Sequence, residues 1–201
     1  PHFTEAGIDI DSVSDDPLQT LLPSWKLVSP NINFQLTAFK KDHTSAAVYK
    51  QRYLEQCSHY TGFEKIFTDG SLKDDSVAAA SVSERRLRRP MQHRLPDGCS
   101  IYTAELKAIL LALKHIYQSS HTSFLLVSDS LSALQAISTR KISHPFLADF
   151  HDLHSELVGE GKEIVFLWVP SHMGIRGNDV VDRAAKEALR HEIICEPLQF
   201  I

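Results

Sequence analysis

Residues 123–137 read SFLLVSDSLSALQAI, and this stretch decides the fold. Its first part, Ser123–Ser128, is almost wholly apolar, which is typical of a central strand buried on both faces of a sheet. Asp129 follows the strand, and Ser130 can cap a helix that continues through Ile137. A buried strand that leads directly into a helix indicates an α/β protein, with a carboxylate at the carboxyl end of a strand.

The segments on both sides extend this pattern. Before it, the sequence predicts strands at Glu64–Thr68, Val77–Ser83 and Pro90–Leu95 and an amphipathic helix at Ile101–Gln118. After it come a helix that opens at Pro145, a second buried strand at Glu163–Trp168, and a last helix with Val181, Ala184, Ala185, Ala188 and Leu189 on one face. This order predicts a five-stranded mixed sheet, with its first three strands antiparallel and helices on both faces.

The first third of the chain differs in composition from the rest. Residues 1–61 are predicted to be a linker or N-terminal extension, because prolines and acidic residues punctuate its first half. One helix is expected near 46–58, capped by Thr44 or Ser45. Residues 62–193 are the predicted domain, and 194–201 the predicted C-terminal tail.

Composition limits the possible classes of protein. The formal net charge of −4 argues against a protein that holds nucleic acid by overall charge alone. No apolar run reaches membrane-spanning length and no signal peptide is recognisable, so we expect a soluble protein without a membrane partner. Cys57, Cys99 and Cys195 have no Cys-x-x-Cys spacing, which favours a reducing compartment, in the cytoplasm or the nucleus. A monomer is expected.

Four carboxylates stand in ordered positions along the chain. Asp69 and Asp129 are expected at the ends of strands, and Glu105 and Asp182 in the first turns of helices. Each acid taken alone has a structural explanation, as a turn residue or as an acid near a helix N-terminus. Taken together, they are placed to converge at one edge of the sheet, where α/β proteins form their sites. Several negative charges cannot be buried together without a cation, so the pattern predicts divalent metal.

The motifs around these acids resemble those of a known family. TDGS at 68–71, TAEL at 103–106, SDS at 128–130 and WVPSHMGIRGND at 168–179 together resemble the type I ribonuclease H family. The resemblance covers about residues 63–191 and implies the ribonuclease H-like fold.

A finer resemblance concerns the kind of ribonuclease H. SDSLSALQAI at 128–137 and DRAAKEA at 182–188 are similar to the version carried by non-LTR retrotransposon polyproteins, where the domain follows a reverse transcriptase. The stretch FKK at 39–41 and the helix after it also resemble the segment that joins polymerase to nuclease. A reverse transcriptase domain in cis is the implied partner.

The resemblance implies roles for individual residues. The four carboxylates would be catalytic and would hold two Mg²⁺ ions, for which Mn²⁺ can substitute, as in two-metal nucleases. His172, in a glycine-containing loop, would move protons or assist product release. Substrate contacts are expected at Gly70, Ser71, Ser130 and Asn178.

The implied activity is endonucleolytic hydrolysis of the RNA strand of RNA–DNA hybrids. Two alternatives remain: a catalytically silent remnant that only binds nucleic acid, and an integrase-like enzyme, although integrases usually show the order Asp, Asp, Glu. Many members of the family carry Asn just before the helical Glu to read 2′-hydroxyls, whereas this chain has Ile101 and Tyr102. A basic handle found in some members is replaced here by Arg140–His144. Binding of hybrid without a tether should therefore be weak.

Two weaker signals leave alternatives open. The arginines at 85, 86, 88, 89 and 94 could contact a phosphate backbone, or they could be a solvated hairpin tip that protects a sheet edge. His151 and His154 have a helical spacing that suits a metal, but a solvated helix face is the favoured interpretation.

Overall fold

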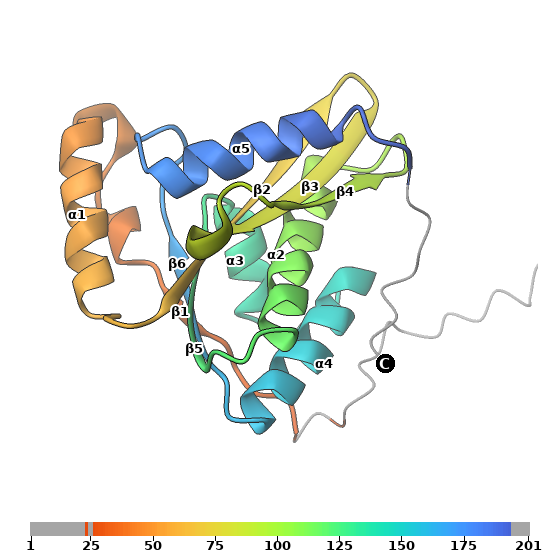
Figure 1. The fold of residues 1–201 in the computed structure, drawn as a ribbon, viewed down its shortest axis with the longest axis horizontal. Helices are drawn as coiled ribbons and strands as arrows, with labels where there is room; N and C mark the ends of the chain where they lie inside the picture. The colour runs from red at the N-terminus through yellow and green to blue at the C-terminus, as the bar shows by residue number, and fades with distance from the viewer. Residues whose placement is uncertain (1–22, 24–25, 194–201) are drawn as a thin grey trace, which may run out of the picture.

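The computed structural model describes residue 23 and residues 26–193 (Figure 1). The acidic start of the chain, Trp25, Cys195 and the predicted tail at 194–201 lie outside the described residues. The described part forms one mixed sheet with helices packed on both faces, as the sequence predicts.

The strands lie in the order β1-β6-β5-β2-β3-β4. Their bounds are β1 Asn31–Asn33, β2 Glu64–Lys73, β3 Ser76–Ser83, β4 Met91–Leu95, β5 Ser123–Ser128 and β6 Glu163–Trp168. The first three strands of the predicted domain, β2, β3 and β4, are antiparallel neighbours, and β5 and β6 run parallel to β2. The predicted antiparallel start and parallel continuation are confirmed.

The sheet has one strand more than the five predicted. β1 pairs in parallel with β6, in a register that places Asn31 opposite Val165. It has only three residues, NIN, which is too short for a period-two pattern to be recognised. The pairing covers the backbone edge that β6 would otherwise expose. Part of the segment before residue 62 thus belongs to the sheet, while the domain boundary at residue 62 stays a prediction.

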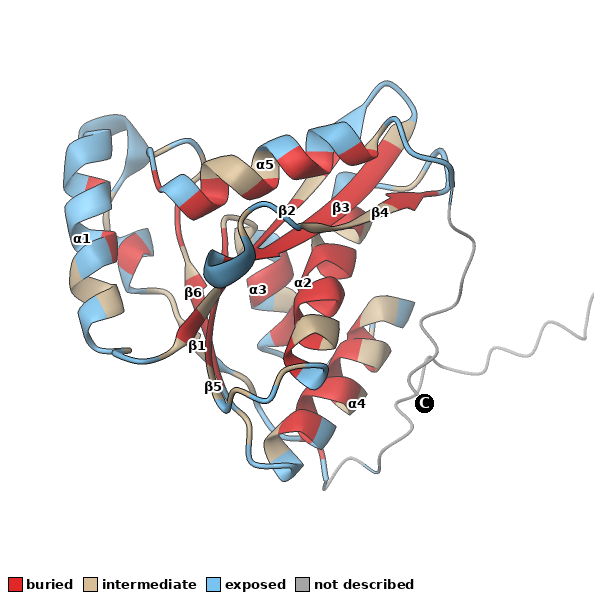
Figure 2. Cartoon of the chain, viewed as in Figure 1, coloured by how far each residue is buried: buried red, intermediate tan, exposed pale blue. Residues whose placement is uncertain are grey.

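Helices cover both faces of the sheet (Figure 1). Their bounds are α1 Ala46–Ser58, α2 Ile101–Tyr117, α3 Leu131–Ile137, α4 Pro145–Gly159 and α5 Arg176–Ala188. Apolar side chains of α2, α3 and α4 pack with β5 and β6 in one core cluster, whereas α5 and α1 pack on the other face. Figure 2 shows α2 mostly buried and α1 mostly exposed.

Serine side chains define the starts of three helices. Ser45, Ser100 and Ser130 each accept a hydrogen bond from the backbone N–H of the third residue of α1, α2 and α3. Each cap satisfies one backbone donor that would otherwise lack a partner, which typically stabilises by ~1 kcal/mol. The caps predicted at Ser45 and Ser130 are confirmed.

Among the described residues, no helix combines the length and the apolar composition needed to cross a bilayer.

Three of the four acids occupy positions that differ from the predicted ones. β2 does not end at Thr68 but continues to Lys73, so Asp69 lies inside the strand, opposite Ala80 of β3. Glu105 is the fifth residue of α2, and Asp182 the seventh residue of α5, so both lie in second turns rather than first turns. The reason in α5 is that the helix begins early, at Arg176.

Three polar side chains predicted at the surface are buried. Arg94 is only 4% exposed, and its guanidinium donates to the carbonyls of Val77 and Leu189, so it does not belong to the arginine turn. His151 and His154 are each 1% exposed, because α4 turns them towards the core rather than to solvent. The predicted solvated helix face was therefore wrong.

Candidate active site

Asp69 and Asp129 come from neighbouring strands at the place where their pairing stops. The parallel ladder between β2 and β5 ends with Thr68 opposite Ser128, and each aspartate is the next residue. β5 ends there, whereas β2 continues beside β3. Beyond this last pair, β2 has an open edge on the side where Asp129 lies.

Glu105 reaches the same place from α2. A Cβ atom on Gly70 would lie 2.9 Å from the backbone nitrogen of Glu105 and 3.0 Å from the Cβ of Ala104. Only glycine therefore lets α2 come this close to β2. Carboxylate oxygens of Asp69, Glu105 and Asp129 all lie within 4.8 Å of one another. The structure thus brings together three of the four acids that the sequence singled out.

Mutual repulsion and burial make these carboxylates difficult to ionise. Burial raises the pKa of Asp69 to about 8, with further contributions from the charges of Asp129 and Asp182. The pKa of Glu105 is raised well above its ordinary value by burial and by Asp69 and Asp129. Burial also raises the pKa of Asp129, against the opposing effect of a hydrogen bond from Asn178. The group therefore binds protons tightly unless another cation replaces them.

A divalent metal ion fits these residues. Glu105 Oε2 is buried and has no hydrogen-bond partner in the described part of the chain. Three carboxylates supply the hard oxygen ligands that Mg²⁺ and Mn²⁺ prefer. A divalent cation would both satisfy the orphan oxygen and remove the repulsion that raises the three pKa values.

Asp182 is not part of this group. Its carboxylate forms an ion pair with Lys186, one turn further along α5, at 2.7 Å. Its charge nevertheless raises the pKa of both Asp69 and Asp129, so it acts electrostatically on these two aspartates from α5. Lys186 was missed in the sequence, although its position four residues after Asp182 is the spacing at which helical ion pairs form.

The position of α5 depends on a contact with the sheet. A Cβ atom on Gly177 would lie 2.1 Å from the Phe67 ring, which leaves no room for any other residue. Phe67 is two residues before Asp69 in β2. This contact therefore fixes the first turn of α5 against the strand that carries Asp69.

Asp129 is held by two neighbours. Asn178 Nδ2 donates to Asp129 Oδ2 at 3.2 Å, and Trp168 Nε1 donates to the Asp129 carbonyl at 3.1 Å. Asn178 is 3% exposed, so it lies beneath the carboxylate rather than at the surface. Sequence reasoning missed Trp168, because nothing in WVPSH shows which carbonyl its indole would reach.

His172 lies in the loop between β6 and α5. It is exposed and has a φ of 62°, a left-handed conformation that is uncommon for residues other than glycine. Its charge lowers the pKa of Asp129, so the imidazole is close enough to act on the acids electrostatically. The neighbouring Ser171 accepts a hydrogen bond from Lys41 Nζ at 3.0 Å, which ties the loop to the N-terminal segment.

The remaining predicted substrate contacts have structural partners. Ser130 caps α3, and Ser71 is 8% exposed in β2, opposite Ala78. Gly70 faces α2. Contact of these three residues with substrate stays a prediction.

The comparison with known families agrees with this geometry. Residues 63–190 match the family model described as RNase H. The chain belongs to the RNase H family. The match contains all of Asp69, Glu105, Asp129 and Asp182, so the acidic group lies inside the RNase H part of the chain. Membership implies a nuclease that hydrolyses the RNA strand of RNA–DNA hybrids with divalent metal.

Proposed function

We propose that this chain is an RNA–DNA hybrid endonuclease that uses two Mg²⁺ ions, with Mn²⁺ as a possible substitute. The observation that carries the proposal is the group of three carboxylates within 4.8 Å, one of which has a buried oxygen that finds no hydrogen-bond partner among the described residues. Asp69, Glu105 and Asp129 would hold the ions, and Asp182 would join them once its carboxylate leaves Lys186. When bound, the ions activate water and stabilise the charge that develops on the scissile phosphate.

The protein groups around the ions would orient the carboxylates and move protons. Asn178 would orient the Asp129 carboxylate, and Trp168 holds the backbone carbonyl of the same residue. Gly70 lets α2 carry Glu105 into the group, where its Oε2 atom is buried. His172, on its exposed loop, would take up or release a proton at a ring nitrogen as product leaves.

Recognition of the substrate depends on the shape of the duplex. A hybrid with A-like geometry has a wide minor groove that displays ribose 2′-hydroxyls. At the start of α2, one turn before Glu105, this chain has Ile101 and Tyr102, whose side chains are poorly suited to hydrogen-bond ribose 2′-hydroxyls. Backbone groups near Gly70, Ser71 and Ser130 would therefore make more of the contacts with the 2′-hydroxyls. The affinity of the chain for free hybrid should be low.

A tethered polymerase would compensate for the low affinity. We propose that the chain is the RNase H part of a non-LTR retrotransposon polyprotein, monomeric and intracellular, with a reverse transcriptase domain in cis. The motifs at 128–137 and 182–188 support this context. So does the close packing of the preceding segment, in which β1 joins the sheet and Lys41 bonds to the His172 loop. A tether raises the effective concentration of hybrid at the site.

Cleavage of a labelled hybrid tests the proposal. The wild-type chain should cut the RNA strand in the presence of Mg²⁺ and leave 3′-hydroxyl and 5′-phosphate ends, while duplex DNA stays intact. Asp129→Asn keeps the shape of the side chain but removes its charge, so it should bind hybrid and fail to cut. Wild-type protein that binds hybrid and never cuts it under any divalent metal would instead identify a silent nucleic-acid-binding remnant.

A further inference from the structure

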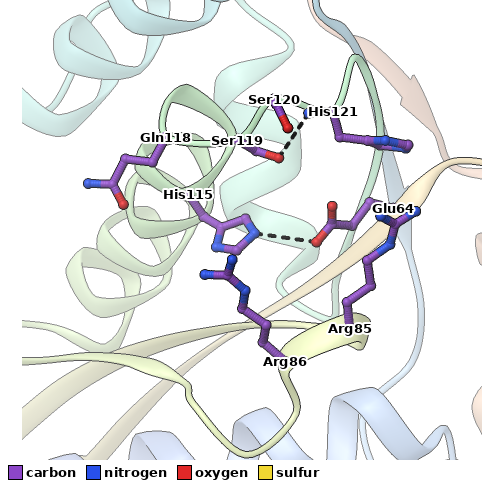
Figure 3. Close-up of a pocket in the computed structure, with 8 residues that line it drawn as sticks. All are labelled: Glu64, Arg85, Arg86, His115, Gln118, Ser119, Ser120 and His121. Atoms are coloured by element: carbon purple, nitrogen blue, oxygen red, sulfur yellow. Dashed lines mark hydrogen bonds and ion pairs between the residues drawn. The ribbon is translucent and has the colours of Figure 1, made fainter.

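A pocket of about 300 Å³ lies at the far end of α2 from the three carboxylates. Its walls come from the last turn of α2 and the loop after it, from the 3₁₀ turn Glu84–Arg86 between β3 and β4, and from the start of β2 (Figure 3). Ten residues of α2 separate Glu105 from His115, which corresponds to about 15 Å along the helix. The pocket is therefore separate from the candidate active site.

The turn beside this pocket is rich in exposed positive charge. Its arginines are Arg85, Arg86, Arg88 and Arg89, of which the first two line the pocket. All four are exposed, and across residues 26–193 no hydrogen bond or ion pair joins their guanidinium groups to another side chain. The acid of the same turn, Glu84, is paired with Lys65 at 2.9 Å. Because the whole chain has a net charge of −4, this positive surface is a local feature.

The one carboxylate in the pocket has partners of its own. Glu64 is 6% exposed, and its Oε1 accepts a hydrogen bond from the Ser83 hydroxyl and lies 3.4 Å from His115 Nε2. Burial opposes its ionisation, but the hydrogen bonds from Ser83 and His115, together with the charges of His115 and Arg85, outweigh burial and lower the pKa of Glu64. The Glu64 charge thus offsets part of the charge of Arg85, but no ion pair within residues 26–193 engages the guanidinium groups, which remain available for a ligand.

The donors around the pocket suit a phosphate group. Guanidinium groups bind phosphate oxygens through two parallel N–H bonds, and they do so with less desolvation than an ammonium group. Arg86 and the His115 ring both line the pocket, as does Gln118, the residue after α2 (Figure 3). The hydroxyl of Ser119 accepts from the His121 backbone and can still donate its own proton.

We propose that this pocket binds phosphate groups, and that a polynucleotide backbone is their source. The choice of a polynucleotide rests on the proposed function, whereas the phosphate chemistry rests on the pocket alone. The separation of about 15 Å along α2 is less than one turn of a duplex, which is about 34 Å. A backbone held at the arginine turn therefore stays near the carboxylates, and supplies affinity that the cleavage site itself lacks.

The salt dependence of hybrid binding tests this inference. Binding of labelled hybrid by the full chain is measured in EDTA, so that no cleavage occurs, for wild type and for Arg85→Gln/Arg86→Gln. Loss of two phosphate contacts should lower the slope of log K against log salt by ~1.8 and weaken binding at low salt. The control, Lys50→Gln/Arg52→Gln, removes the same charge from exposed positions of α1 and should leave the slope unchanged.

A second arm separates the two sources of phosphate. Inorganic phosphate is added during thermal unfolding of wild type and of the arginine variant, whose own unfolding also shows that it folds. A slope that falls only in the arginine variant supports the backbone as the ligand. A phosphate-induced rise in the unfolding temperature of wild type alone, with an unchanged slope, supports the phosphate site and assigns it to free phosphate. An unchanged slope together with no response to phosphate overturns the inference.

Failure of this inference and failure of the proposed function are distinguishable. In Mg²⁺, the arginine variant should cut hybrid with an unchanged kcat and a raised KM. If wild type does not cut hybrid, but the salt slope of binding is still lower in the arginine variant, the nuclease proposal fails and the phosphate-binding inference is supported. If wild type cuts, but the slope does not change and phosphate does not alter its unfolding temperature, the nuclease proposal is supported and the inference about the pocket fails.

Discussion

Replacing Asp69 with Asn should stabilise the metal-free protein while it removes activity. The pKa of Asp69 rises from 3.8 to about 8 on folding, because burial and the charges of Asp129 and Asp182 oppose ionisation. A raised folded pKa means that stability is fully present below pH 3.8 and is lost as the pH rises towards 8. At ~1.4 kcal/mol per pH unit, the loss reaches about 2 kcal/mol at pH 5 and up to about 4 kcal/mol at pH 7.

Thermal unfolding in EDTA measures this effect. Asn keeps the size of the side chain without the charge, so Asp69→Asn should unfold at a higher temperature than wild type, by roughly 2–4 °C for each kcal/mol. The gap should widen between pH 5 and pH 7. The exposed turn residue Asp75 provides the matched control, because Asp75→Asn should change nothing. Mg²⁺ should then raise the unfolding temperature of wild type but hardly that of Asp69→Asn, since bound ligand stabilises only the form that binds it.

Two results would contradict the electrostatic strain assigned to the three carboxylates. One is an Asp69→Asn variant that is no more stable than wild type at any pH in EDTA, which would mean that the three carboxylates do not strain the fold. The other is an equal rise in unfolding temperature on adding Mg²⁺ to both proteins, which would mean that the ion binds elsewhere.

Three further predictions concern individual residues. Burial and the charge of His151 lower the pKa of His154 from 6.5 to about 4, so its folded state resists protonation and stability is lost as the pH falls. Acid titrations followed by circular dichroism should show a loss of about 3 kcal/mol between pH 7 and pH 4 that is absent in His154→Leu. Gly177→Ala should destabilise by about 1–3 kcal/mol or more in urea unfolding, with partial recovery on adding Phe67→Leu; no change would contradict the tight contact of α5 with β2. His172→Ala should slow turnover by up to ~10²-fold while metal binding, followed by calorimetry, is kept; loss of metal binding would argue against its role in the loop.

Features set by local sequence were predictable. The strand at Ser123–Ser128, the cap at Ser130 and the position of Asp129 between them depend only on neighbouring residues, and the structure has all three. The meeting of Asp69 with Asp129 followed from the parallel order of their strands. It did not require Asp69 to end its strand, because what matters is where the ladder between β2 and β5 stops.

Features that depend on distant packing were not predictable. His151 and His154 share a helix face, but which face is buried depends on the core beneath α4 and on the segment around Val28 that runs beside Ser155. β1 is recognisable as a strand only because it pairs with β6, which lies more than a hundred residues later in the sequence. Arg94 is buried because its guanidinium reaches the Leu189 carbonyl at the end of α5, a contact that the sequence of β4 alone does not show. By contrast, one error could have been avoided, because the spacing of Asp182 and Lys186 predicts their ion pair.

The central claim is that the three clustered carboxylates hold divalent metal in order to cut RNA in a hybrid. The most direct test is the rate of hybrid cleavage as Mg²⁺ is raised from zero, for wild type and for Glu105→Gln, whose side chain keeps its shape and loses its charge. The account predicts no cleavage by wild type in EDTA, a rate that rises steeply with Mg²⁺, and no cleavage by Glu105→Gln at any concentration. Cleavage that persists in EDTA, or that proceeds equally fast in Glu105→Gln, would contradict it.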